Sequence, residues 1–264
     1  MIPTPWYDPS GEVRLLASRP APAGLMLATK ITLPDLPDSE LREFDLRLNP
    51  DYPVQIKDQN GKGACNGHAA ASSYEDASYI SGLPHVPISA WSIYAPLCNG
   101  WDVGSSIAEA LQLFEQQGAA EESYVPYGTI NPKQLSAEAL ANRACHKIEI
   151  GCKLHTFRDL LVAAHMRFPF NFSVPVNSGF NTLDEYDVPQ NRPGDHNHAV
   201  SGGFALKKSV KYNWLVPTRN SWGTNWGRKG YFNTAERTIL GPGFDAYCVI
   251  ATVINPHYAP PKAA

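Results

Sequence analysis

The sequence of 264 residues predicts an α+β fold in which helices come first and strands follow. Segments with helix signals lie between residues 63 and 167, and short strand-like runs dominate after Phe168. The composition, with 43% apolar and 18% charged residues, is that of a globular protein, and 23 prolines and 20 glycines indicate many turns. A chain of this length can form one large domain or two joined halves with a cleft.

Charge and hydropathy argue against two classes of partner. The formal charge is −3 and no basic run is present, so neither nucleic acid nor an anionic membrane surface is expected to bind. No apolar stretch is long enough for a membrane span, and the N-terminal MIPTPWYDPSGEVRLL lacks the basic start and apolar core of a secretion signal. We expect a soluble protein that is cytoplasmic as synthesised, with export by a non-standard route or incorporation into a larger assembly as alternatives.

Residues 1–49 predict an N-terminal arm rather than a domain. The segment is rich in proline, and its apolar runs are short, as in the stretch from Leu25 to Leu33. We expect either a packed arm or partly disordered tail, or a segment that lies near a cleft and regulates access to it. At the other end, residues 255–264 predict a flexible tail.

The segment that begins at residue 63 predicts a helix, because alanines and other small residues continue until Gly82. Cys65 would then lie in the first turn of this helix. A second helix can be capped by Ser105 or Ser106 and would end at Gly118. Its apolar stripe, at helical spacing, consists of Ile107, Ala110, Leu111 and Phe114. Two further helices are expected over residues 136–145 and 156–167.

The five cysteines are odd in number and form no CxxC pair, so neither a disulfide framework nor a zinc site is indicated. Cys98, Cys145, Cys152 and Cys248 are expected to be small buried side chains. Cys65 differs because a helix N-terminus lowers the pKa of a thiol, and only the thiolate is a nucleophile. A thiolate catalyst also needs a histidine and a polar group that orients it, for which His198 and Asn220 are candidates.

Three blocks of sequence then resemble the papain family of cysteine peptidases. They are QNGKGACNGHAA, NHAVSGGFAL and RNSWGTNWGRKGYF, in the order found in that family. His198 follows Cys65 by 133 residues and Asn220 follows it by 155. The resemblance implies a catalytic domain over residues 50–254, with a helical half at about 55–150, an antiparallel β-barrel-like half at about 151–254, and the active-site cleft between them.

The resemblance also implies roles for the side chains in these blocks. Cys65 would be the nucleophile, His198 the general base and acid, and Asn220 the residue that orients the histidine. Gln59, six residues before Cys65, would contribute its amide to the oxyanion hole together with the Cys65 backbone N–H. The competing histidine, His196, is expected to be structural.

Further residues are implied as supporting or substrate-binding groups. Trp222 would shield the contact between histidine and asparagine from water, and Trp226 would help to form the wall of the leaving-group side of the cleft. A weaker match over residues 88–128 suggests Gly100, or alternatively Gly104, as the place where substrate backbone pairs with the cleft.

The chain also departs from the family pattern. Lys62 replaces a cysteine of the signature, so the disulfide usual there in secreted members cannot form. Asn66 replaces an aromatic residue, which removes a packing anchor beside the nucleophile. The arm is too short for the long helical inhibitory propeptide of secreted relatives, so the pattern is closer to bacterial members.

The sequence therefore predicts a cysteine endopeptidase that acts on protein or peptide substrates and needs no metal or organic cofactor. The proline-rich composition of the arm leads us to predict that it partly covers the cleft. Two alternatives stay open: a catalytically silent scaffold or binding protein with the same fold, and another acyl-transfer enzyme such as an amidase, deamidase or transglutaminase-like enzyme.

Overall fold

The structure, a computed structural model, describes residues 4–252. Its α-helices are α1 (Cys65–Ile80), α2 (Ala90–Cys98), α3 (Ile107–Gln117), α4 (Ala137–Arg143) and α5 (Phe157–His165). Four of them, α1, α3, α4 and α5, occupy segments in which the sequence predicts helices. Within the described residues no helix combines the length and the apolar character that a membrane crossing requires. The predicted tail of residues 255–264 lies outside this range.

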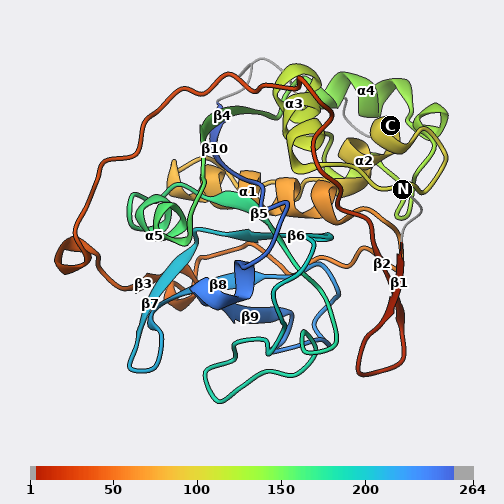
Figure 1. Ribbon diagram of the computed structural model, residues 1–264. Coiled ribbons are helices and arrows are strands. Elements are labelled where there is room, and N and C mark those ends of the chain that lie inside the picture. The colour runs from red at the N-terminus through yellow and green to blue at the C-terminus, as the bar shows by residue number, and fades with distance from the viewer. Residues whose placement is uncertain (1–3, 253–264) are drawn as a thin grey trace.

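Antiparallel strands form the second part of the fold. They are β1 (Thr4–Tyr7), β2 (Val13–Leu16), β3 (Phe44–Asp45), β4 (Lys147–Lys153), β5 (Phe170–Val174), β6 (His198–Gly202), β7 (Ala205–Ser209), β8 (Asn213–Arg219), β9 (Tyr231–Thr234) and β10 (Ala246–Thr252). β1 and β2 form a separate hairpin, whereas the others join one sheet in the order β3-β7-β8-β6-β5-β10-β4, with β9 beside β8. The five α-helices of the described residues, four of which precede β4, and the curled antiparallel sheet confirm the predicted α+β class (Figure 1).

Helix α1 lies at the centre of the molecule and joins the two parts of the fold. It packs against α2 and α3 on one side and against β6, β5 and β10 on the other, so nearly its whole surface is buried. Small residues make this close packing possible. They are Ala69, Ala70, Ala71, Ser72 and Ser73, all of which are buried. The first turn of α1 therefore faces the start of β6.

Helix α3 shows why the sequence signals were sufficient in this region. The Ser106 hydroxyl accepts from the N–H of Glu109, and the Glu109 carboxylate accepts from the N–H of Ser106, which is a complete capping box. Gly118 ends the helix with a positive φ of 77°, a value that glycine adopts more readily than other residues. The predicted stripe of Ile107, Ala110, Leu111 and Phe114 is buried.

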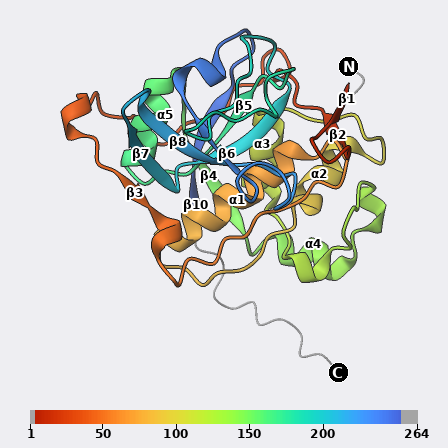
Figure 2. The ribbon, with the colours of Figure 1, turned by 90° about the horizontal axis from the view of Figure 1, so that it is seen from below.

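The N-terminal arm follows a long extended path around the molecule. From the β1–β2 hairpin it passes α2 and α3 and then turns toward β3, which pairs with β7 (Figures 1 and 2). Half-way along this path, the N–H groups of Lys30 and Ile31 both donate to the carbonyl of Gly151. The arm is thus attached to both the helical part and the sheet.

Candidate active site

Cys65 is the first residue of α1, as expected from the small residues that follow it. The side chain is completely buried. Burial raises the pKa of the Cys65 thiol to about 11, and hydrogen bonds from the backbone of Ala199, Asn66 and Ala17 act in the opposite direction. Of these three residues, Asn66 follows Cys65 in α1, Ala199 follows His198 in β6, and Ala17 belongs to the arm.

His198 and Asn220 come together because β6 pairs with β8. The register places Ser201 opposite Arg219, so the start of β6 lies beside the end of β8. His198 Nε2 is 2.7 Å from Asn220 Oδ1, which also accepts from the N–H of Ser221 at 2.8 Å. The other ring nitrogen of His198, Nδ1, is buried and has no hydrogen-bond partner within the described residues. Burial lowers the pKa of His198 to about 4.

Trp222 and Trp226 form an aromatic layer behind this pair. The Trp222 ring lies 4.8 Å from the His198 ring, centroid to centroid, and is completely buried. Trp226 packs edge-on against Trp222 at 5.2 Å and stacks on Phe180, while its N–H donates to Asn181. The two tryptophans exclude water from one side of the histidine and at the same time belong to the hydrophobic core.

Gln59 lies in the loop before α1, where its side-chain amide is fixed at both ends. Its Oε1 accepts from the Ser221 hydroxyl at 2.7 Å, so the amide Nε2 must point the opposite way. Nε2 donates to the carbonyl of Lys62 and, at 3.2 Å, to the carbonyl of Leu15 in the arm. The contact of Ser221 with this amide could not be predicted, because a serine next to Asn220 has no distinctive spacing from Gln59.

The arm passes directly over this group of side chains. We call residues 14–19 the cleft segment. The N–H of Ser105 donates to the carbonyl of Ala17 at 3.2 Å, and the N–H of Arg19 donates to the carbonyl of Ser105 at 3.0 Å. On the opposite side, the N–H of Ser18 donates to the carbonyl of Asn197 at 3.0 Å, next to His198. The cleft segment is therefore paired with the polypeptide on both sides.

Of the two glycines suggested for substrate backbone, only Gly104 lies at the cleft segment. A Cβ atom at Gly104 would stand 2.0 Å from the Ala17 carbonyl oxygen, so the close approach requires glycine. Gly100 lies beside Asn131 and donates to the carbonyl of Ile130, and the structure does not bring it to the catalytic group. The pairing residue is Ser105, which was missed because backbone pairing needs no particular side chain.

Arg14 anchors the other end of the cleft segment. Its guanidinium bonds to Asp8 at 3.0 Å and to Asp58 at 2.8 Å, and it also donates to the carbonyl of Trp222 at 3.2 Å. The side chains of Arg14 and Asp8 are each only 3% exposed. Asp58 directly precedes Gln59, so these ion pairs lie next to one of the candidate catalytic side chains.

Comparison with known protein families gives a match to the papain family cysteine proteases over residues 41–254. The chain belongs to this family. Thiol protease aleurain of Arabidopsis thaliana is 25% identical over 231 residues, which make up 84% of this chain and 62% of the relative. Cathepsin L-like proteinase of Fasciola hepatica is 26% identical over 196 residues, or 70% of this chain and 57% of the relative. The chain thus spans less than two thirds of the length of these relatives.

The fold of this papain-family protein is shared with solved structures of low sequence identity. Xylellain, a cysteine protease from Xylella fastidiosa, superposes with a TM-score of 0.65 at 19% identity, covering 88% of this chain and 98% of xylellain. ProCathepsin B S9 from Trypanosoma congolense gives a TM-score of 0.63 at 18% identity and covers 88% and 85% of the two chains. The predicted papain-like fold is confirmed by these neighbours.

Asn66, one of the departures from the family pattern, has a defined set of contacts. It is 1% exposed, and its Nδ2 donates to the carbonyl of Ser105 at 2.7 Å. Its Oδ1 faces the Ser18 hydroxyl at 3.4 Å. Where an aromatic residue would only pack, Asn66 connects the first turn of α1 with the residue that pairs with the cleft segment.

The remaining histidines near the site are satisfied by structural contacts. His196 lies between the Ser173 hydroxyl at 2.8 Å and the carbonyl of Ile239 at 3.1 Å, so it does not compete with His198. His68, three residues after Cys65, contacts the carbonyls of Ala64 and Asp58. Burial lowers the pKa of His68 to about 4.

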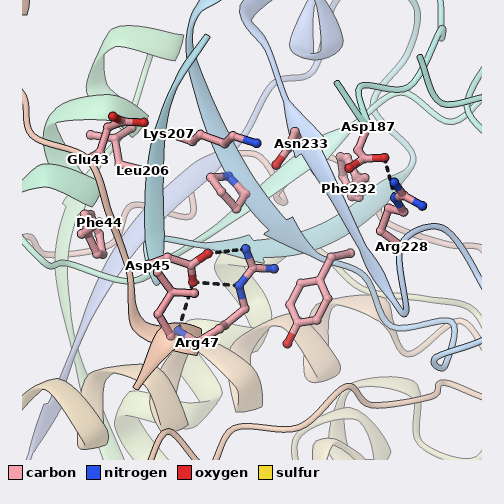
Figure 3. A pocket seen from close by; sticks show the side chains of 13 residues that line it. Glu43, Phe44, Asp45, Arg47, Asp187, Leu206, Lys207, Arg228, Phe232 and Asn233 are labelled. Carbon is pink, nitrogen blue, oxygen red and sulfur yellow. Dashed lines mark hydrogen bonds and ion pairs between the residues drawn. The ribbon is translucent and has the colours of Figure 1, made fainter. Parts of the chain in front are cut away.

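A separate cavity of about 520 Å³ lies on the sheet, among β3, β7, β8 and β9 (Figure 3). Its two arginines are each paired with a carboxylate, Arg47 with Asp45 and Arg228 with Asp187. None of the catalytic candidates lines this cavity. The chemistry-bearing residues of the family motifs are instead gathered beneath the cleft segment.

Proposed function

We propose that the protein is a cysteine peptidase in which Cys65, His198, Asn220 and Gln59 carry out the reaction. The observation that carries this proposal is the 2.7 Å contact of His198 Nε2 with Asn220 Oδ1, while Nδ1 has no hydrogen-bond partner among the described residues. Nδ1 is therefore the ring nitrogen that we assign to the proton of Cys65, because Nε2 is held by Asn220. Membership of the papain family supports the same assignment.

The first step follows from these positions. The sulfur of Cys65 attacks the carbonyl carbon of a peptide bond, and the thiol proton moves to His198, whose positive charge is stabilised by Asn220. The negative charge that develops on the carbonyl oxygen is stabilised by the Gln59 amide and by the N–H of Cys65 at the start of α1. In the structure, the carbonyl of Leu15 in the arm accepts a hydrogen bond from this Gln59 amide.

The second step releases the products. The carbon–nitrogen bond breaks as His198 returns its proton to the departing amine, which leaves a thioester on Cys65. His198 then removes a proton from water, and the water oxygen attacks the thioester carbon. The carbon–sulfur bond breaks, the carboxylic acid product leaves, and His198 returns the proton to the Cys65 sulfur. The substrate class that fits this sequence is a protein or peptide in extended conformation.

We further propose that the arm is an inhibitory segment. The cleft segment occupies the backbone partners of Ser105 and the amide of Gln59, both of which a substrate would need. The cleft segment also covers Cys65 and His198, and their burial opposes the charged forms of both side chains. A neutral thiol is a poor nucleophile, so the covered site is expected to be inactive.

The experiment that tests the peptidase proposal is covalent labelling with a peptidyl epoxide, read by mass spectrometry on the full chain. The wild type and an Arg14→Ala chain, in which the arm is loosened, are compared with Cys65→Ala and His198→Ala. We expect one adduct on Cys65 that disappears in both active-site variants, together with hydrolysis of a peptide substrate. Cys145→Ala is the matched control, because Cys145 is also buried but lies away from the site.

Two results would contradict the proposal. Absence of an adduct on Cys65 in both the wild type and the Arg14→Ala chain, although both are folded, would favour a catalytically silent scaffold. Labelling of Cys65 with hydrolysis of small amides but of no peptide would favour another acyl-transfer reaction.

A further inference from the structure

Two glycine-containing loops, which we call the cleft walls, lie against the cleft segment close to the nucleophile. Gly63 lies two residues before Cys65, and Gly104 directly precedes Ser105, the residue that pairs with the cleft segment. Both glycines touch Ala17: a Cβ at Gly63 would lie 2.7 Å from the Ala17 Cβ, and a Cβ at Gly104 would lie 2.0 Å from the Ala17 oxygen. The space between the two loops therefore has the width of one extended backbone.

Two side chains connect these loops through three hydrogen bonds. Asp102 Oδ1 accepts from the N–H of Gly63 at 2.8 Å and from the hydroxyl of Tyr94 at 2.6 Å. The N–H of Gly104 donates to the same Tyr94 oxygen at 3.0 Å. The amides of the two cleft walls are thus linked through one carboxylate oxygen and one phenol.

The Tyr94 hydroxyl is suited to this role because it keeps its proton. Tyr94 belongs to α2 and is completely buried. Burial raises the pKa of Tyr94, and the hydrogen bond to Asp102 raises it further. The phenol therefore donates to the carboxylate and accepts from Gly104 over the whole working pH range, and α2 holds it in a fixed position.

Apolar packing contributes little to the position of the loop that contains Asp102. Trp101 is 77% exposed and Val103 is 40% exposed, so its apolar side chains do not pack into the core. On the other wall, Lys62 stands where secreted family members have a disulfide cysteine, so no covalent link holds the loop before Cys65. Among the described residues, the bonds to Asp102 link the two walls through side chains at Gly63 and Gly104, and Asn66 adds a second side-chain link at Ser105.

We propose that Asp102, together with Tyr94, is a positioning residue that sets the spacing of the Gly63 and Gly104–Ser105 backbones for an extended peptide. The link takes the place of a covalent one in a chain that lacks the signature cysteine at position 62. Asn66 supports the same wall, because its Nδ2 donates to the Ser105 carbonyl. This inference rests on the proposed peptidase function, since it concerns how a peptide is held beside Cys65.

The test compares two reagents that modify Cys65 in the full chain. Both a peptidyl epoxide and iodoacetamide require the arm to move away, so the ratio of their second-order rate constants is independent of arm opening. Only the epoxide uses the backbone groups of the cleft wall. The variants are Asp102→Ala, Asp102→Asn and Tyr94→Phe, and amide hydrogen exchange at Gly63 and Gly104 is measured in each.

We expect Asp102→Ala to lower the epoxide-to-iodoacetamide ratio by about tenfold, because two hydrogen bonds to a charged group are lost. Tyr94→Phe, which removes only a hydroxyl from a buried ring, should lower the ratio in the same direction. Asp102→Asn keeps the accepting oxygen and should restore most of the ratio. Exchange at Gly63 should accelerate in Asp102→Ala, and exchange at Gly104 should accelerate in Tyr94→Phe.

The outcomes separate this inference from the peptidase proposal. A clear epoxide preference in the wild type that is unchanged in Asp102→Ala and Tyr94→Phe would overturn the positioning role alone. A wild type in which the epoxide reacts no better than iodoacetamide would overturn the peptidase proposal as well, because there would be no peptide binding to position. A lowered ratio that Asp102→Asn fails to restore would also contradict the inference, since the accepting oxygen is retained.

Discussion

The arm is held in two different ways on the two sides of Leu15, whose carbonyl accepts from the Gln59 amide. Before Leu15, the contact depends on side chains: Arg14, which is paired with Asp8 inside the arm, bonds to the partly exposed Asp58 and to the carbonyl of Trp222. After Leu15, the contact depends on backbone groups, because Ala17 and Arg19 pair with Ser105 through N–H and carbonyl groups.

The difference between these two regions has a functional consequence. Backbone pairing is available to any extended peptide, so the arm and a substrate would compete for Ser105 on equal terms. The charged anchor, Arg14 with Asp58, is available only to a peptide that carries an arginine directly before the residue at the position of Leu15. A substitution in the charged anchor can therefore change how tightly the cleft segment is held without changing how a substrate is bound.

The largest expected effect comes from removing the charged anchor. Arg14→Ala removes the hydrogen bonds that join the arm to Asp58 and to the carbonyl of Trp222, and hydrogen bonds to charged groups contribute about 1.5–3 kcal/mol. The population with the arm displaced should rise by about 10- to 10²-fold, since each 1.4 kcal/mol is tenfold. The measurement is the rate at which iodoacetamide modifies Cys65 in the full chain. An unchanged rate in a folded variant would mean that the backbone contacts alone hold the arm.

A second expected effect arises from protonation of His198. Burial lowers its pKa to about 4 in the covered site, whereas an exposed histidine has a value near 6.5. Protons therefore bind more tightly when the arm is displaced, and the stability of the covered state is lost as pH falls from about 6.5 toward 4. At pH 5 the covered state should be weaker by up to about 2 kcal/mol than at pH 7.

Hydrogen exchange at the amides of Ser18 and Arg19, corrected for intrinsic rates, measures this loss of the covered state. His198→Gln should remove most of the pH dependence. Asp8 is not expected to contribute at pH 5, because hydrogen bonds from Ser10 and Arg14 outweigh its burial and hold its pKa below the ordinary value. Equal pH dependence in wild type and His198→Gln would show that another group is responsible.

The two regions also differ in how far the sequence could predict them. Cys65, His198, Asn220 and Gln59 carry their identity in side chains at recognisable spacing, and the structure gathers them beneath the cleft segment. The fold class followed from helix signals such as the Ser106 cap, and family comparison confirms it. The cytoplasmic location stays a prediction.

Residues that act through the backbone could not be found in this way. Ser105 pairs with the arm through its N–H and carbonyl, so no side-chain pattern distinguishes it from Gly100 or Gly104. The contacts of Asp102 depend on Tyr94 and Gly63, and these three residues come from three separate segments of the chain. Such contacts arise only when the tertiary structure brings the loops together.

A third expected effect comes from filling the close contact at Gly104. In Gly104→Ala the new Cβ would meet the Ala17 oxygen, and φ of 75° is costly for any residue with a side chain. Backbone strain of about 1–2 kcal/mol would accompany the clash. Iodoacetamide labelling of Cys65 should rise by about tenfold, whereas labelling by the peptidyl epoxide should rise less, because the same Cβ obstructs a bound peptide.

Gly82→Ala provides the matched control for backbone strain. Gly82 has φ of 69° and no atom near its missing Cβ, so it shares the strain but not the clash. If Gly82→Ala accelerated labelling as much as Gly104→Ala, general destabilisation would explain both results and the contact with Ala17 would be irrelevant.

The smallest expected effect concerns the only charged pair that the cleft segment forms after Leu15 among the described residues. Arg19 bonds to Glu109 at 3.0 Å, but these side chains are 34% and 20% exposed, and partly exposed pairs contribute about 0.2–1 kcal/mol. Arg19→Ala should therefore accelerate iodoacetamide labelling of Cys65 by no more than about fivefold, and less at high salt. The matched comparison is Arg14→Ala at the same pH. Equal acceleration of Cys65 labelling in the two variants would mean that side chains anchor the arm on both sides of Leu15. The arm would then have an advantage over a substrate in the competition for Ser105.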